Sequence, residues 1–283
     1  GLPIATVRSR LTGTRLVSVP FSDVCPPIVD SDAQERALLA AVDAERTRCA
    51  LPLEVHAEVP SLPGGATSES FYRHLIPLEG GRDDVLRRVA QPKRRAASKA
   101  DKLGVEVHRR TDEGALDSFF RLHVLTRHKH GLPTQPRSFF RGLTRLFDSD
   151  LGFVLLAEWE ETPIGASVFL KHRETLTYKY GASDPKHLEK RPNDLLMLEA
   201  LALGCEYGCT TLDLGRTEDY NDGLRRFKRQ LGAEEQVLTY TAAPPREHAD
   251  SVRSVSSLQQ RVIRRLPPAF GRALGAAVYH HFG

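Results

Sequence analysis

The order of strands and helices in the second half of the chain restricts its fold more than any other feature. Apolar and β-branched residues predict three strands in close succession, at 152–159, 164–172 and 175–181. A strand at 105–109, a helix at 112–130 and a shorter helix at 136–147 precede them. A loop at 182–191 follows them, and after it come a helix at 192–207, a strand at 211–214, a helix at 223–231 and a strand at 235–242. This order is typical of a sheet covered by helices. We therefore predict an α/β (α+β) fold with a mixed central sheet flanked by helices.

The first half has a similar element order. Its predicted elements are strands at 3–8, 15–19, 53–58 and 71–78, a helix at 32–49 and a helical region from 83 to 103 that Pro92 interrupts. A length of 283 residues fits about two domains. We predict a tandem of like domains over 1–103 and 104–245, with the first lacking its opening elements. A basic, amphipathic helical tail is predicted over 246–283.

The net charge of +4 is small, but the basic residues are clustered. The stretch 82–110 has ten Lys or Arg residues against four acidic ones, and the stretch from 251 to the end has five Arg and no acidic residue. Such clusters bind polyanions, because neutralised phosphates release counterions. A merely solvated helix face has the same composition. The candidate polyanions are tRNA, a nucleotide-linked sugar and an anionic lipid surface.

The composition excludes several classes of protein. The longest apolar runs fall far short of the roughly 18 to 20 residues that a membrane-spanning helix needs. Hydrophobic residues at 40% and charged residues at 27% are ordinary for a globular protein. Four cysteines are too few for a disulfide framework, and they do not complete a zinc site. We therefore expect a cytoplasmic protein without a bound metal.

Polar residues interrupt the apolar pattern at two elements near the end of the second half. Asp213 lies in an otherwise apolar strand, and a carboxylate there must be paired, with Arg216 as the candidate partner. Lys228 lies on the next helix among Arg225, Arg226 and Arg229. Neighbouring cations and burial would both lower the pKa of this lysine. The lysine is suited to stabilise a developing oxyanion, although a solvated basic helix is the alternative.

Several motifs are concentrated between residues 178 and 233. They are Tyr180-Gly181-Ala182-Ser183, Arg191-Pro192-Asn193-Asp194-Leu195-Leu196, Asp213-Leu214-Gly215-Arg216-Thr217, Gly223-Leu224-Arg225-Arg226-Phe227-Lys228 and Leu231-Gly232-Ala233. Together they resemble the C-terminal GNAT domain of the Fem-type (FemAB-like) acyltransferases and a BioF2-like acetyltransferase domain. The basic run from Lys93 to Ala100 is similar to the helix between the two GNAT-like halves of that family. The segment 122–133 is similar to an exopolysaccharide-associated subgroup.

The resemblance implies tandem GNAT-like domains and an enzyme that forms an amide. The amino group of an acceptor attacks the ester carbonyl of an aminoacyl-tRNA, which is the donor, and no further cofactor is needed. The implied acceptor is an amine of a cell-envelope or polysaccharide precursor. The family has a Phe-Lys pair at its active site, which corresponds here to Phe227, near the tRNA terminus, and Lys228, the catalytic oxyanion stabiliser. The other candidate substrate-binding residues are Asp213, Arg216, Tyr180, Asn193, Arg127 and His130.

Two alternatives stay open at this point. A CoA-dependent N-acyltransferase would use acetyl-CoA or another acyl-CoA on the same fold. The glycine pattern that cradles the CoA pyrophosphate at a helix start is absent from 181–193, although Lys186, Lys190 and Arg191 offer phosphate contacts. A non-catalytic GNAT pair that only binds tRNA, lipid or a protein is the second alternative.

The predicted tail has two sides. Ile263, Leu266 and Phe270 share one side with further apolar residues, and Pro267-Pro268 interrupts the helix. Basic amphipathic helices of this kind lie on anionic membranes, and packing against the domain or against a partner is an equal alternative. We therefore expect peripheral contact with an anionic membrane through residues 251–283.

Overall fold

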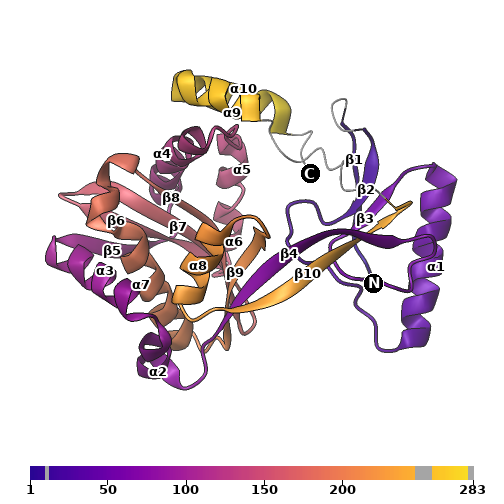
Figure 1. Cartoon of the computed structure of the whole chain (residues 1–283), viewed down its shortest axis with the longest axis horizontal. Coiled ribbons are helices and arrows are strands. Elements are labelled where there is room, and N and C mark those ends of the chain that lie inside the picture. Colours follow the sequence, from indigo (N-terminus) through magenta and orange to yellow (C-terminus); the bar gives the residue numbers. More distant parts are fainter. Residues whose placement is uncertain (10–12, 246–256, 280–283) are drawn as a thin grey trace.

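The computed structural model describes residues 1–9, 13–245 and 257–279, and its strands form one mixed sheet (Figure 1). The strands are β1 (Ile4–Val7), β2 (Arg15–Ser18), β3 (Leu53–Val55), β4 (Ala66–Pro77), β5 (Val105–Arg110), β6 (Gly152–Trp159), β7 (Thr162–His172), β8 (Thr175–Ser183), β9 (Thr211–Glu218) and β10 (Glu234–Ala243). Their order across the sheet is β1-β2-β3-β10-β4-β9-β8-β7-β6-β5. The pairs β2–β3 and β8–β9 are parallel, and the other pairs are antiparallel. The predicted fold class is confirmed.

The helices are α1 (Asp32–Cys49), α2 (Gly81–Arg88), α3 (Gln91–Lys102), α4 (Glu113–His130), α5 (Arg137–Arg141), α6 (Thr144–Asp148), the 3₁₀ helix η1 (Pro185–Lys190), α7 (Pro192–Glu206), α8 (Asp222–Gln230), α9 (Ser257–Arg265) and α10 (Pro268–Val278). Side chains cap several of them. The carboxylate of Asp112 accepts a hydrogen bond from the backbone N–H of Ala115 at the start of α4, and Gly131, with φ of 67°, ends that helix. None of the described helices is long and apolar enough to cross a bilayer.

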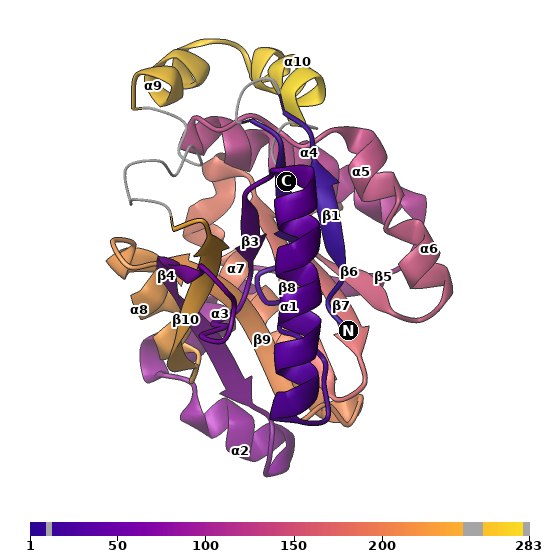
Figure 2. The same ribbon diagram turned by 90° about the vertical axis from the view of Figure 1, so that its right-hand side faces the viewer.

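Successive side chains of a strand point to opposite faces of the sheet, and both faces of this sheet are apolar. On β6, Phe153 and Leu155 pack with α2, α3 and α7, whereas Val154 and Leu156 pack with α4, α5 and α6. A sheet covered by helices on both faces needs apolar residues at successive positions, which explains the continuous apolar run of β6. The other end of the sheet is covered by α1 (Figure 2), with Leu39 and Val42 buried.

Segments from both predicted domains share one hydrophobic cluster. Ile76, Val85 and Ala100 pack in the same cluster as Leu155 and Leu196. β4 also lies between β9 and β10 in the sheet. The domain boundary after residue 103 stays a prediction. Residues from both sides of this boundary pack in the same hydrophobic cluster.

Several predicted boundaries differ from the structure. Strand β3 ends at Val55 rather than at residue 58, and β4 begins at Ala66 rather than at residue 71. The helix expected over 136–147 is two short helices, α5 and α6, and the hydroxyl of Thr144 donates to the carbonyl oxygen of Arg141 at the interruption. The expected loop 182–191 contains η1, and β9 continues four residues past Leu214 to Glu218. The last difference matters, because the added residues position the candidate site.

The parallel strands β8 and β9 pair only at their beginnings. Their register joins Thr175–Thr177 to Thr211–Asp213, after which each strand continues without pairing to the other. Polar contacts from the segment 21–23 reach both strands beyond that point. Nζ of Lys179 donates to the carbonyl oxygen of Phe21 (2.8 Å), and the backbone N–H of Arg216 donates to Oδ2 of Asp23 (3.3 Å). The fold thus brings an early loop to the polar ends of two late strands.

Candidate active site

Lys228 of α8 is buried, with 3% of its surface exposed. Its Nζ donates to the carbonyl oxygens of Gly215 (3.0 Å) and Arg216 (3.1 Å) on β9. Burial lowers the pKa of this ammonium from 10.5 to about 8, while the carboxylates of Asp23, Asp213 and Glu218 act in the opposite direction. Two of the three N–H groups are thus used, which leaves one donor for a further acceptor.

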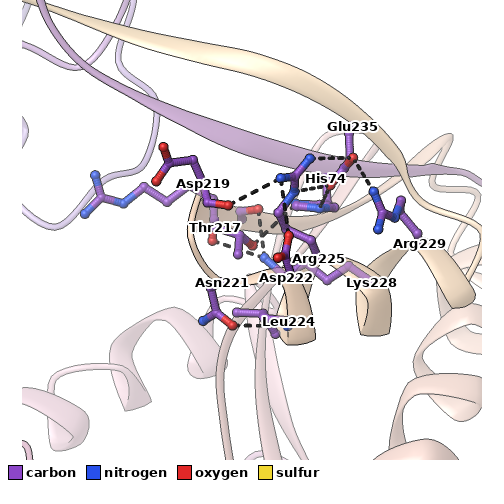
Figure 3. A network of polar contacts seen from close by, with 12 residues as sticks. His74, Thr217, Asp219, Asn221, Asp222, Leu224, Arg225, Lys228, Arg229 and Glu235 are labelled. Carbon is purple, nitrogen blue, oxygen red and sulfur yellow. Dashed lines mark hydrogen bonds and ion pairs between the residues drawn. The ribbon is translucent and has the colours of Figure 1, made fainter.

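The arginines that flank Lys228 are not the cause of its lowered pKa, contrary to the sequence-based expectation. Figure 3 shows two of them converging on Glu235 of β10. Nε of Arg225 donates to Oε1 of Glu235 (2.9 Å), and a terminal nitrogen of Arg229 donates to Oε2 (3.0 Å). The hydrogen bonds from Arg225 hold the pKa of Glu235 at about 2. Nε2 of the buried His74 lies 3.0 Å from Oε1 of Glu235, so this carboxylate ties α8 to β4 and β10.

Gly215 produces the turn of the backbone that presents two carbonyl oxygens to Lys228. The register of β4 with β9 shifts here, so that Leu214 and Gly215 together lie opposite His74. Gly215 has φ of 69°, a left-handed conformation that disfavours a side chain. A Cβ at this position would also lie 2.7 Å from Oδ2 of Asp23. Glycine is therefore required for the geometry around Lys228.

We expect Gly215→Ala to lower the free energy of unfolding by about 1–2 kcal/mol, the cost of a left-handed alanine, and to reduce turnover. The matched control is Gly208→Ala, since Gly208 has φ of 68° and a Cβ added there would meet no described atom within 4 Å. Thermal unfolding should show a loss for Gly215→Ala at least as large as that for Gly208→Ala, because only the Cβ at position 215 crowds Asp23, and only Gly215→Ala should change turnover. Equal turnover losses in the two variants would count against a role for the bulge in the site.

Asp213 pairs with Arg73 of β4 rather than with Arg216, which corrects the sequence-based pairing. Nε and a terminal nitrogen of Arg73 donate to Oδ2 of Asp213 at 3.0 and 2.6 Å. Its other oxygen accepts a hydrogen bond from the backbone N–H of Gly215 (2.7 Å). Asp213 is 8% exposed, so both contacts offset the cost of burying its charge. The carboxylate thereby fixes the start of the bulge.

Arg216 lies between an aromatic pair and a carboxylate. Its guanidinium carbon is 4.1 Å from the centroid of the Phe71 ring, and a terminal nitrogen donates to the hydroxyl of Tyr240 (3.1 Å). Its Nε is 3.7 Å from a carboxylate oxygen of Asp23. Asp23 also acts electrostatically on Lys228 and on Tyr180 of β8. The carboxylate of Asp23 therefore connects Arg216, Lys228 and Tyr180, which were all selected from the sequence.

Phe227 occupies the side of α8 that faces the large cluster shared by α3 and α7. Nζ of Lys93 lies 4.1 Å from the centroid of its ring and donates to the buried carboxylate of Asp194 (2.8 Å). Asp194 is in the first turn of α7, where the helix dipole favours a negative charge. The two side chains of the Phe-Lys pair therefore have different environments. Phe227 packs against the hydrophobic core beside α3, and Lys228 donates hydrogen bonds to β9.

Tyr180 of β8 and Arg127 of α4 lie on the side of the sheet that α4 covers. Tyr180 packs against the rings of Phe139 and Phe140, and burial raises the pKa of its hydroxyl. Burial lowers the pKa of Arg127 to about 10. Nε of Arg127 donates to the carbonyl oxygen of Pro133 (2.9 Å), and no described carboxylate forms an ion pair with the guanidinium. An uncompensated cation of this kind favours an anionic group beside it.

The sequence matches a family model described as "Acetyltransferase (GNAT) domain" over residues 86–229, just over half of the chain. The chain belongs to this GNAT family. The predicted acyltransferase is thus confirmed at the level of the family. No curated protein matches the chain significantly.

Three solved structures show the same fold as this GNAT chain. "Crystal structure of FemX" is 15% identical, with a TM-score of 0.62, and covers 86% of this chain and 88% of its own. The C-terminal domain of a putative lysylphosphatidylglycerol synthetase from Agrobacterium fabrum is 11% identical, with a TM-score of 0.61 and coverage of 92% and 84%. A tandem GNAT protein from the clavulanic acid biosynthesis pathway is 14% identical, with a TM-score of 0.52 and coverage of 83% and 75%.

The remaining candidates of the GNAT chain lie at other points of the fold. Asn193 is at the start of α7, and its amide nitrogen is 3.4 Å from the hydroxyl of Ser183. His130 is exposed at the end of α4. No described group of His, Cys, Asp or Glu side chains is arranged to hold a metal ion. Among the candidate residues, Lys228, Asp213 and Arg216 are therefore the ones that meet at the bulge of β9.

Sequence reasoning missed Asp23, Arg73, His74 and Glu235 in this GNAT site. Arg73 and His74 are adjacent polar residues inside a predicted strand, and that interruption is a usable signal for buried polar contacts. Asp23 lies in a loop, 193 residues before Arg216, and carries no local signal of the contact.

Proposed function

We propose that this GNAT enzyme transfers an aminoacyl group from aminoacyl-tRNA to an amine of a cell-envelope or polysaccharide precursor, as in the Fem-type family. The observation that carries the proposal is the buried Lys228 ammonium. It is fixed by two backbone carbonyls, retains one N–H donor, and lies beside the bulge of β9. Such a preorganised cation offsets negative charge that develops on a carbonyl oxygen.

The reaction forms a C–N bond between the acceptor amine and the ester carbonyl carbon of the donor. The electron pair of the C=O bond moves to oxygen, and the third N–H of Lys228 donates to this oxyanion. Collapse of the tetrahedral intermediate breaks the bond to the ribose oxygen of the tRNA, which takes up the proton lost by the amine. Lys228 stays an ammonium throughout, so it acts by charge and hydrogen bonding and transfers no proton.

The charge near α7 supports tRNA over CoA as the donor. A CoA pyrophosphate in a GNAT fold lies at the start of the helix that follows the central strand, where backbone N–H groups are free. Here the first turn of α7 already holds the buried carboxylate of Asp194, paired with Lys93. The backbone N–H of Asp194 also donates to the carbonyl oxygen of Arg191 (3.2 Å), so it is not free for a phosphate. By contrast, Arg94, Arg95 and Lys99 of the adjacent α3 are exposed and can meet tRNA phosphates.

The environment of Arg127 supports an acceptor that carries a phosphate or carboxylate. The guanidinium is largely buried, and no described carboxylate neutralises it. Precursors of envelope polymers that are linked to a nucleotide or a lipid carry phosphates, which match this cation. The resemblance of 122–133 to the exopolysaccharide-associated subgroup includes Arg127 and points to the same class of acceptor.

The donor is tested by incubating the protein with radiolabelled aminoacyl-tRNA or radiolabelled acetyl-CoA and a panel of amine-bearing envelope precursors. We expect a hydroxylamine-stable amide product with aminoacyl-tRNA. Acetyl-CoA turnover without tRNA would replace the proposal with an N-acetyltransferase, and equilibrium binding without product would replace it with a binding module.

A charge variant sharpens the test. Replacing Arg94, Arg95 and Lys99 of α3 by Gln should weaken tRNA binding and reduce the slope of log K against log salt by about 3, because three phosphate contacts are lost. The matched control changes Arg36, Arg141 and Arg145 to Gln, three exposed basic residues outside the stretch 82–110, and should leave the slope unchanged. An unchanged salt slope in the α3 variant would contradict the proposed tRNA surface.

A further inference from the structure

The C-terminal helices α9 and α10 present a basic surface that the proposed reaction does not use. They pack on the end of α4, where Ile263 is 3% exposed and the backbone N–H of Thr134 donates to the carbonyl oxygen of Gly271 (3.2 Å). Both helices lie at the top of Figure 1, drawn in yellow, outside the layers around the sheet. Residues 246–256 and 280–283 of the predicted tail lie outside the described part of the chain. One side of this helix pair is therefore anchored, and the other faces solvent.

The outer side is positively charged. Its exposed cations are Arg261, Arg264, Arg265 and Arg272, with Lys129 at the adjoining end of α4. The sequence from 251 to the end has no acidic residue. Arg261, Arg265 and Arg272 make no hydrogen bond or ion pair with any described residue. Clustered cations without local counter-charges attract an anionic surface.

Apolar side chains are exposed among these arginines. Val262 of α9 is 47% exposed and Phe270 of α10 is 44% exposed. A helix that lies on a membrane places such side chains at the boundary between headgroups and acyl chains while its cations meet anionic headgroups. A nucleic acid would satisfy the arginines but gives Val262 nothing to bury against. The combination therefore favours a lipid surface over a polynucleotide.

We propose that α9 and α10 bind the surface of an anionic phospholipid bilayer and hold the enzyme there peripherally. The contact reaches the candidate site through the end of α10. The ring of Tyr279 stacks on Phe21 at 5.0 Å between centroids, and the carbonyl oxygen of Phe21 accepts the hydrogen bond from Lys179 of β8. Tyr279 thus connects the end of α10 to the loop that carries Asp23.

The test is cosedimentation of the full chain with vesicles of 30% phosphatidylglycerol and 70% phosphatidylcholine, compared with pure phosphatidylcholine. We expect binding to the anionic vesicles only, with a strong decrease between about 0.05 and 0.5 M NaCl because salt screens the charges. Each arginine near the surface contributes about fivefold in affinity, so R261Q/R265Q/R272Q should bind about 100-fold more weakly. The exposed positions of these residues make the variant compatible with folding, which its thermal unfolding curve checks.

A fluorescent probe reports the contact independently. The chain has one tryptophan, Trp159 on β6, so a Trp159→Phe/Phe270→Trp variant has its single indole on α10. Its emission should shift to the blue with anionic vesicles and stay unchanged with phosphatidylcholine alone.

Two controls separate this proposal from the reaction. The α3 variant with Arg94, Arg95 and Lys99 changed to Gln should bind vesicles like the wild type while losing tRNA affinity. Equal binding of wild type and R261Q/R265Q/R272Q to anionic vesicles would overturn the membrane proposal. It would also be overturned if the arginine variant lost affinity for unacylated tRNA and kept its affinity for vesicles. Neither result depends on amide formation.

Discussion

Lys228→Met lowers kcat by about 10²- to 10³-fold, the loss expected when one preorganised oxyanion donor is removed. Methionine has a similar length, so the position between α8 and β9 stays filled. The substitution removes a costly buried ammonium but leaves the carbonyl oxygens of Gly215 and Arg216 without their donor. These effects on stability oppose each other, so the loss of turnover should exceed any loss of stability. Single-turnover rates with aminoacyl-tRNA, together with thermal unfolding, check both statements.

The control for this variant is Lys171→Met, which removes a surface lysine that pairs with the exposed Asp150. It should keep the wild-type kcat. Wild-type kcat in Lys228→Met, in a protein that remains folded, would remove Lys228 from the mechanism.

The lowered pKa of Lys228 gives the same experiment a pH dependence. Below about pH 8 the buried lysine carries its charge, and above it the charge is lost. The wild-type rate should therefore fall as pH rises through about 8, and Lys228→Met should lack this alkaline decrease. Stability changes in the opposite direction. Because the unfolded lysine, with pKa near 10.5, binds a proton more strongly than the folded one, the free energy of unfolding should rise between about pH 8 and 10.5 in the wild type only.

The sequence predicts most of the local elements of the fold, although not η1 or the division between α5 and α6. The apolar stripe of α1 predicted residues 32–49, which agree with the observed helix at both ends. The alternating strands and helices of the second half were predicted for the same reason, since hydrophobic periodicity is a local signal. The place of β4 between β9 and β10 was not predicted, because strand pairing over more than a hundred residues leaves no periodic trace.

The candidate site also has a part that the sequence predicts and a part that it does not. Lys228 and Asp213 were selected from their positions in the sequence, and the structure brings them together beside Gly215. The sequence does not determine whether Lys228 is buried, since a solvated basic helix would have the same residues. The structure separates the two cases, because Arg226 of the same helix is exposed. The partner of Asp213 was predicted wrongly, because Arg216 is near in sequence whereas Arg73 is near in the sheet.

Arg73→Met lowers the free energy of unfolding by about 3 kcal/mol. The substitution leaves the carboxylate of Asp213, whose side chain is 11% exposed, without its cation, and breaking such a pair from one side costs about 3–5 kcal/mol. The lower end applies because the side chain of Arg73 is 29% exposed and therefore partly screened by water. Equilibrium unfolding in urea measures the change. Arg48→Met, which breaks an exposed ion pair on α1, is the control and should leave the midpoint unchanged.

A double-mutant cycle identifies the cause of that loss. If the unpaired charge is responsible, Asp213→Asn should restore more than half of the stability lost in Arg73→Met, because asparagine keeps an acceptor for the N–H of Gly215 without a charge. If the two losses simply add, the contribution of Arg73 is packing against β9 rather than pairing with Asp213. Turnover distinguishes a further role. A double variant that regains stability but not kcat indicates that the negative charge of Asp213, which favours the ammonium form of Lys228, is itself needed for the reaction.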